Sequence, residues 1–179
     1  MTETPIIPSF EDAAGIEAPA GRKICFICSK GNLDMAYPAL IMGNAALGEG
    51  IETHFFFTFW GMDIITRRTM GNLKFSMVGN TAMHMPQAPT MPLPAIMGSL
   101  PGMTGMATNM MKKQIAGLEV PEVPEFLDQL IEMGAHMWAC KMSFDMAKLT
   151  EADLYEGVEA VISATDFIEI AEGAQIIFI

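Results

Sequence analysis

Residues 22–60 read "RKICFICSKGNLDMAYPALIMGNAALGEGIETHFFFTFW", and this stretch decides the fold. It holds a short apolar run at 22–28, an aliphatic segment with helical spacing at 34–48, and a β-branched and aromatic run at 51–60. Runs that are apolar almost throughout are typical of strands buried on both faces of a parallel sheet. Pro38, in the first turn of the middle segment, favours a helix there. The stretch therefore predicts a strand, a helix and a second parallel strand.

The same alternation continues to the end of the sequence. Further strands are predicted at 136–140, 158–162 and 175–179, and further helices at 61–68, 121–134 and 163–174. Thr150 with Asp153, and Ser163 with Asp166, have the spacing of capping boxes at helix N-termini. Alternating strands and helices give an α/β fold, and right-handed crossovers place helices on both faces of the sheet. We predict a three-layer sandwich of flavodoxin-like type with a five-stranded, mostly parallel sheet.

The chain divides into a leader and one domain. Residues 1–21 are acidic and rich in proline, and they lack the basic and apolar regions of a signal peptide. We expect them to precede a single domain at 22–179, which contains a Met-, Pro- and Gly-rich insertion at about 71–115. Ten of the 18 methionines lie between Met70 and Met111. Five prolines interrupt this stretch, so no membrane-spanning helix is predicted there.

Composition excludes several classes of protein. The chain is 51% hydrophobic and 17% charged, which excludes a disordered protein and favours a well-filled core. Its formal net charge of −11 repels phosphate backbones, so nucleic-acid binding is not expected. Three cysteines are too few for a secreted disulfide framework, and we therefore expect a cytoplasmic protein.

Cys140 is the main candidate for a reactive group. It ends the predicted strand at 136–140, and the next helix is predicted to begin near Ser143 or Phe144. Ligands of parallel α/β sheets bind at the carboxyl ends of the strands, where helix N-terminal N–H groups also lower the pKa of a thiol. Lys141 adds a positive charge, which Asp145 opposes. The alternative is a small buried residue that closes the strand, but its position at the binding edge favours a reactive thiol.

The other two cysteines have a C-x-x-C spacing inside a predicted strand. Residues three apart on a strand point to opposite faces, which disfavours a thioredoxin-like dithiol for Cys25 and Cys28. Cys25 is expected in the core. Cys28 lies at the exit of its strand and can approach Cys140 if the two strands are neighbours; otherwise it is a core residue. The secondary site candidates are Cys28, Lys30, Ser143 and Asp145.

The sequence predicts no metal and no cofactor. His54, His84 and His136 have no ligand spacing to one another or to a cysteine. Thioethers suit Cu(I), but a Met-rich segment is more often adaptable packing at an interface. Neither a dinucleotide nor a P-loop glycine motif is present, so a nucleotide or flavin protein on the same fold is a weaker alternative.

Three stretches resemble one known family. Residues 29–63, which include "FFTFWG", resemble the first βαβ unit of the DsrE/DsrF/DrsH-like family, in its DsrE2-type branch. "ACKMSFDM" at 139–146 is similar to the cysteine signature of that branch, and 156–179 to its last strand–helix–strand unit. The resemblance implies a sulfur carrier, sulfurtransferase-like in its chemistry. Its cysteine, here Cys140, would hold a persulfide or an S-thiosulfonate.

The resemblance also implies partners. These are the sulfur donor and acceptor proteins of a relay, and further copies of the chain in a homo-oligomer. An apolar lid would protect a persulfide from small thiols, and the Met-rich segment is a candidate for such a lid or for an interface. The residues expected to form it are Trp60, Met83, Met85, Met91, Met97 and Met103. The alternative is a non-catalytic scaffold or binding module that docks a partner, or a membrane surface, through the Met-rich segment.

Overall fold

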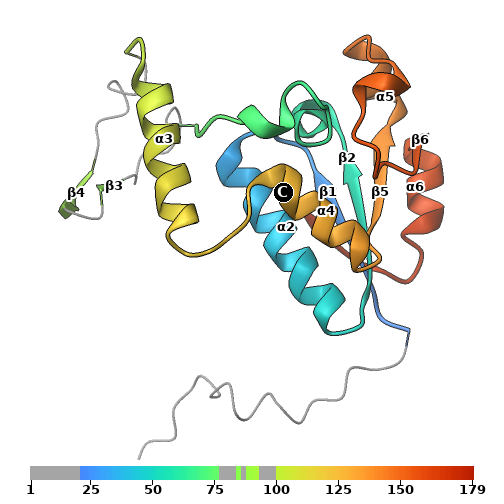
Figure 1. Cartoon of the computed structure of the whole chain (residues 1–179). Coiled ribbons are helices and arrows are strands. Elements are labelled where there is room, and N and C mark those ends of the chain that lie inside the picture. The colour runs from blue at the N-terminus through green and yellow to red at the C-terminus, as the bar shows by residue number, and fades with distance from the viewer. Residues whose placement is uncertain (1–20, 77–83, 86–87, 93–99) are drawn as a thin grey trace, which may run out of the picture.

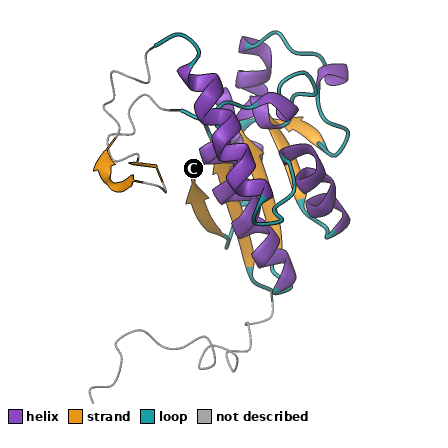
Figure 2. Ribbon diagram, turned by 60° about the vertical axis from the view of Figure 1, so that its left-hand side comes forward, coloured by secondary structure: helices purple, strands orange, loops and turns teal. Residues whose placement is uncertain are grey.

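The structure, a computed structural model, describes residues 21–76, 84–85, 88–92 and 100–179. It confirms the α/β prediction: a five-stranded sheet has the order β6-β5-β2-β1-β7, and every pairing in it is parallel. The strands are β1 (Lys23–Cys28), β2 (Glu52–Phe57), β5 (His136–Cys140), β6 (Ala160–Ile162) and β7 (Gln175–Phe178). Helices cover both faces of this sheet (Figures 1 and 2). The predicted leader at 1–21 lies outside the described residues, apart from Gly21.

The strand order differs from that of flavodoxin. In chain order the five strands are arranged 4-3-2-1-5, whereas flavodoxin has 2-1-3-4-5. The first four strands step across the sheet in one direction. The last connection returns from β6 at one edge to β7 at the other. A single crossover, which contains helix α6 (Ala164–Ile170), therefore spans the whole sheet.

The first face of the sheet is covered by α2 (Leu33–Gly48) and α4 (Val123–Glu132), which pack side by side (Figure 1). Phe26 and Phe55 point to this face and stack with their ring centroids 5.2 Å apart. Gly43 lets α2 approach closely, because a Cβ there would lie 2.2 Å from Cζ of Phe55. This face holds the larger core, built from alternate residues of the strands.

The second face is covered by the shorter helix α6. Phe167 of α6 stacks on Phe56 with the ring centroids 4.4 Å apart. The predicted capping box is confirmed: the Ser163 N–H donates to Asp166 Oδ2 at 2.9 Å, and the Asp166 N–H donates to Ser163 Oγ at 3.2 Å. This second core also contains Cys25 and Cys140.

Several predicted helices have different bounds or types. The helix predicted at 61–68 is a 3₁₀ helix, η1 (Phe59–Ile64), and the chain then forms an isolated bridge between Thr66 and Leu154. The capping box at Thr150 is confirmed, but it begins a 3₁₀ helix, η4 (Glu151–Asp153), rather than an α-helix. Just after these segments, the Tyr155 N–H donates to the Ile65 carbonyl and the Arg67 N–H to the Asp153 carbonyl, so the two stretches pair with each other instead of continuing as helices.

The Met-rich insertion has regular structure in part. It contains the antiparallel hairpin β3 (His84–Met85) and β4 (Ala88–Pro92), and helix α3 (Met103–Ala116). The side chain of Thr108 on α3 accepts a hydrogen bond from the Phe75 N–H at 3.0 Å, which attaches α3 to the domain. Among the residues that the structure describes, none of the helices has the length and hydrophobicity that a bilayer crossing needs.

A stack of rings joins β2 and β5 near their amino ends. His54 and His136 are register partners, and their ring centroids lie 4.6 Å apart. The Trp138 indole N–H donates to His54 Nδ1 at 3.2 Å, so Nδ1 carries no proton and His54 is neutral. Its Nε2 lies 2.8 Å from Glu52 Oε1. Burial lowers the pKa of His54, and the hydrogen bond to Glu52 only partly opposes this.

This stack predicts a loss of stability in mild acid. Below about pH 6.5 the unfolded chain binds a proton at His54 that the folded chain does not, so the free energy of unfolding falls as the pH falls. Urea denaturation between pH 7.5 and 5.5 should show this fall in the wild type and a smaller fall in His54→Gln. The glutamine side chain still offers one donor and one acceptor but does not titrate. Equal pH dependence in the two proteins would contradict the assignment.

Candidate functional site

Cys140 lies at the junction of a strand and a helix. It is the last residue of β5, and helix α5 (Lys141–Met146) begins at the next residue, two or three positions earlier than predicted. The sharp change from strand to helix turns the N–H groups of Met142 and Ser143 toward the Cys140 thiol. Cys140 itself is only 5% exposed. A sulfur atom here meets peptide dipoles rather than bulk water.

Four hydrogen-bond donors near the thiol act on its pKa. Burial by itself raises the pKa of Cys140. The hydroxyls of Thr58 and Ser143, together with the N–H groups of Ser143 and Met142, outweigh burial, so the pKa lies below that of an ordinary cysteine. Hydrogen bonds to the charged form favour that form, and the arrangement therefore stabilises a thiolate.

The end of β2 supplies the part of the site that the sequence did not predict. The Phe59 N–H donates to Ser143 Oγ at 2.7 Å, and Thr58 Oγ1 lies 3.2 Å from the same oxygen. Because Ser143 Oγ accepts from Phe59, its own hydrogen is free to point to Thr58 or to the Cys140 sulfur. Phe59 has φ +46°, a left-handed conformation that is uncommon for a residue with a bulky side chain. Such backbone strain is often found at functional sites.

Close backbone contacts hold this turn in place. The Thr58 N–H donates to the Cys28 carbonyl at 2.9 Å. Gly61 packs on the same carbonyl, and a Cβ there would lie 2.0 Å from the oxygen. Gly31 in the loop after β1 also lies close to the backbone at Trp60, since a Cβ there would lie 2.4 Å from the Trp60 carbonyl oxygen. The end of β1 thus fixes η1, and η1 fixes Thr58 beside Cys140.

The structure separates Cys28 from the site. Contact between Cys28 and Cys140 would require β1 and β5 to be neighbours. In the observed sheet, β2 lies between them. Cys28 is buried in the core of the first face, whereas Cys140 belongs to the core of the second. Burial raises the pKa of Cys28 to about 12, which leaves it protonated. Cys25 is fully buried, as predicted, and burial raises its pKa as well.

The predicted cations do not reach the thiol. Lys141 Nζ lies 2.5 Å from Asp145 Oδ1, in an exposed ion pair one helical turn apart. Lys30 is exposed in the loop after β1. Of the secondary candidates, Ser143 therefore acts on the Cys140 thiol, whereas Asp145 pairs with Lys141 on the exposed side of α5. The thiol pKa depends on neutral donors rather than on a neighbouring charge.

The residues predicted to form a lid belong to different elements where the structure describes them. Trp60, on η1 next to Phe59, is 69% exposed. Met103 lies on α3 and packs near Phe75 and Ala107, on the opposite side of the domain from α5 (Figure 1). Met85 and Met91 lie on the β3–β4 hairpin. Met83 and Met97 lie outside the described residues. Trp60 follows Phe59, whose N–H donates to Ser143 Oγ, so the chain links Trp60 to the surroundings of Cys140.

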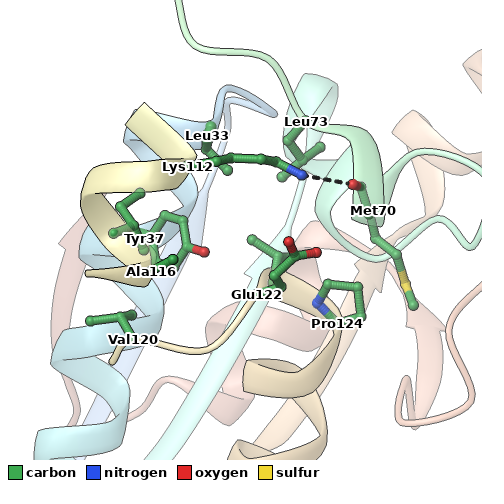
Figure 3. A pocket seen from close by; sticks show the side chains of 12 residues that line it. Leu33, Tyr37, Met70, Leu73, Lys112, Ala116, Val120, Glu122 and Pro124 are labelled. Atoms are coloured by element: carbon green, nitrogen blue, oxygen red, sulfur yellow. Dashed lines mark hydrogen bonds between the residues drawn. The ribbon is translucent and has the colours of Figure 1, made fainter. Parts of the chain in front are cut away.

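One hollow lies beside α3 and another lies beside Trp60. The first, between α2, α3 and α4, has a volume of about 30 Å³, which is room for roughly one water molecule (Figure 3). Lys112 Nζ donates to the Gly71 carbonyl at 3.1 Å across it. The second is wider, at about 300 Å³, and lies beside Trp60 and Asp63 at the carboxyl ends of β1 and β2. Within the described residues, no cluster of His, Cys, Asp and Glu side chains is arranged to hold a metal.

Together the fold and the site define an α/β protein that carries a thiolate-stabilising cysteine at the carboxyl edge of a parallel sheet. The chain belongs to the DsrE/DsrF/DrsH-like family, whose sequence model matches residues 20–179. It is 34% identical to the sulfur carrier protein DsrE2 of Allochromatium vinosum, over 82% of this chain and 91% of that protein. The resemblance seen in the sequence is thereby confirmed.

Two further proteins are similar to this chain over most of its length. The chain is 25% identical to the uncharacterized protein YrkE of Bacillus subtilis, over 88% of this chain and 97% of that protein. The solved structure of MTH1491, a protein of unknown function from Methanobacterium thermoautotrophicum, covers 88% of this chain and aligns over 99% of its own. The TM-score is 0.55 at 12% identity, which supports the fold alone.

The hydroxyl donors give a prediction for the Cys140 pKa. Thr58→Val and Ser143→Ala each remove one donor, so the pKa of the thiol should rise and its alkylation at pH 7 should slow by on the order of tenfold. Thr58→Ser keeps the hydroxyl and should react like the wild type. The measurement is the rate of iodoacetamide alkylation against pH, with the modified cysteine assigned by peptide mass. A pH profile of Thr58→Val identical to that of the wild type would show that Thr58 does not act on Cys140.

Proposed function

We propose that this protein is a sulfur carrier, which holds a sulfane sulfur on Cys140 and passes it to another protein. The observation that carries the proposal is the shell of four donors around a nearly buried thiol at the carboxyl edge of the sheet. The name of its A. vinosum relative, a sulfur carrier protein, supports the same role. The relative YrkE and the neighbour MTH1491 add no function to this argument.

Loading needs no oxidant. The Cys140 thiolate attacks the outer sulfur of a donor persulfide, and a new bond forms between this sulfur and Sγ. The sulfur–sulfur bond of the donor breaks, and its electron pair leaves with the inner sulfur of the donor as a thiolate. A donor shell that lowers the thiol pKa raises the fraction of Cys140 able to attack.

Unloading uses the same donors in reverse. A thiolate of the acceptor protein attacks the terminal sulfur of the Cys140 persulfide, and Cys140 leaves as a thiolate. A thiolate with a low pKa is the better leaving group, so Thr58, Ser143 and the two N–H groups favour release as well as loading. Transfer of a thiosulfonate group would follow the same steps, with the –SO₃⁻ end carried along.

We place this chemistry in a reducing compartment, the cytoplasm. All three cysteines are free, and two of them are sealed in the two cores. The partners are the protein that supplies the sulfur and the protein that accepts it. The exposed Phe59 and Trp60 lie where such a partner would approach the edge of the sheet.

The test is covalent loading. Reduced protein is incubated with polysulfide or with tetrathionate, and intact mass should show one added sulfur or one added thiosulfonate group. Cys140→Ser should gain neither, because the remaining thiols are buried and protonated. Cys28→Ser is the matched control, since it removes a buried thiol and should load like the wild type.

Two outcomes would contradict the proposal. Equal adducts on Cys140→Ser would place the reactive sulfur elsewhere. A wild-type protein that gains no adduct from either reagent would favour the scaffold alternative, in which the cysteines are structural. A loaded protein that then transfers its sulfur to a separate thiol protein, with return to the unloaded mass, would complete the cycle.

A further inference from the structure

Strand β7 forms one edge of the sheet. In the order β6-β5-β2-β1-β7 it pairs with β1 along one side and ends the sheet on the other. Figure 2 shows it as the outermost strand, next to the mark for the end of the chain. An edge strand presents unpaired N–H and C=O groups, and most proteins protect it with charge, proline, a bulge or a covering element.

The direction of the backbone groups follows from the pairing with β1. The Ile179 N–H donates to the Ile27 carbonyl at 2.8 Å, and the Ile179 carbonyl accepts from the Ser29 N–H at 2.8 Å. Residue 179 thus faces β1 with both groups. Since alternate residues of a strand face opposite sides, Ile176 and Phe178 direct their N–H and C=O groups away from the sheet.

The same two residues expose their side chains. In register with Cys25 and Ile27, they lie on the face that α6 covers. Ile176 is 48% exposed and Phe178 is 69% exposed. From Gln175 to Phe178 the strand contains no charge and no proline, and its pairing with β1 is regular. Among the described residues, this edge therefore combines backbone groups that no strand pairs with and apolar side chains that are largely exposed.

We propose that β7 pairs in antiparallel fashion with β7 of a second copy of this chain. A twofold axis next to Ile177 would make one continuous sheet from two. Ile176 would lie opposite the partner subunit's Phe178, and the two residues would form two backbone N–H···O=C hydrogen bonds with each other. The twofold axis makes a second, identical pair from Phe178 and the partner subunit's Ile176. Each pair would cover an exposed isoleucine with an exposed phenylalanine on the α6 face, the side-chain contact that stabilises antiparallel strands.

The charge distribution favours a second copy of this chain as the partner of β7. The chain has a net charge of −11, so most of its surface repels another copy. The uncharged strand "QIIF" (175–178) brings no carboxylate opposite another in this register. Residues 1–20 are a poorer occupant, because their sequence is acidic and contains prolines, which lack the N–H that a paired strand needs. Pairing of β7 with β6 of another copy would build open filaments, whereas the twofold β7–β7 contact gives a closed dimer.

The experiment measures the mass of the full chain in solution. Light scattering after size exclusion should give a dimer or a larger even assembly. Phe178→Lys should halve this mass, with the dissociation constant raised at least about tenfold, since it removes both cross-strand pairs. Ile168→Lys is the matched control: Ile168 is 61% exposed on α6 and off the pairing edge, so its mass should not change. Circular dichroism checks that both variants stay folded.

Cross-linking tests the register itself. Residues opposite one another in a pair without mutual hydrogen bonds have Cα atoms about 4.5 Å apart, which suits a disulfide. Ile177→Cys should therefore give a covalent dimer under mild oxidation, and the wild type should not. A monomeric wild type, or an assembly that Phe178→Lys leaves intact and Ile177→Cys does not cross-link, would overturn the proposal. Neither readout depends on sulfur loading at Cys140, so this proposal and the sulfur-carrier proposal can fail separately.

Discussion

The hydrogen bond from the Phe59 amide to the Ser143 hydroxyl joins the helices that follow the neighbouring strands β2 and β5, and the surroundings of Cys140 depend on it. It brings β2 and β5 together at the point where both chains leave the sheet. It also orients the serine hydroxyl so that its hydrogen is available to sulfur or to Thr58. A thiolate in this position is stabilised by fixed dipoles, which need no counter-ion and do not reorganise when charge appears.

Much of the fold was predictable because its signals are local. The strands at 23–28 and 136–140 and the Ser163 capping box each follow from a few adjacent residues. The position of Cys140 at a strand end followed in the same way. Strand order did not, because it depends on contacts between residues far apart in the sequence. Local pattern also does not separate a 3₁₀ turn from the start of an α-helix, and the helix predicted at 61–68 was wrong for that reason.

Thr58 shows where this limit affected the site. It is a hydroxyl residue at the end of an aromatic strand, which is a visible signal, but its meaning depends on which strand lies beside it. Once Phe57 is paired with Ala139, the next residue on each strand, Thr58 and Cys140, must be adjacent. The same pairing places β2 between Cys28 and Cys140. The pairing of β2 with β5 thus adds Thr58 to the site and removes Cys28 from it.

The isolation of Cys140 from the other two cysteines has a chemical consequence for any cargo. Many thiol proteins discharge a bound sulfur by forming an internal disulfide with a resolving cysteine. Here Cys28 lies across the sheet and Cys25 belongs to a strand that β2 separates from β5, so no second thiol can close such a ring while the sheet is intact. A sulfur atom bound to Cys140 has no exit within its own chain. If Cys140 carries sulfur, as proposed, a second molecule must therefore accept it.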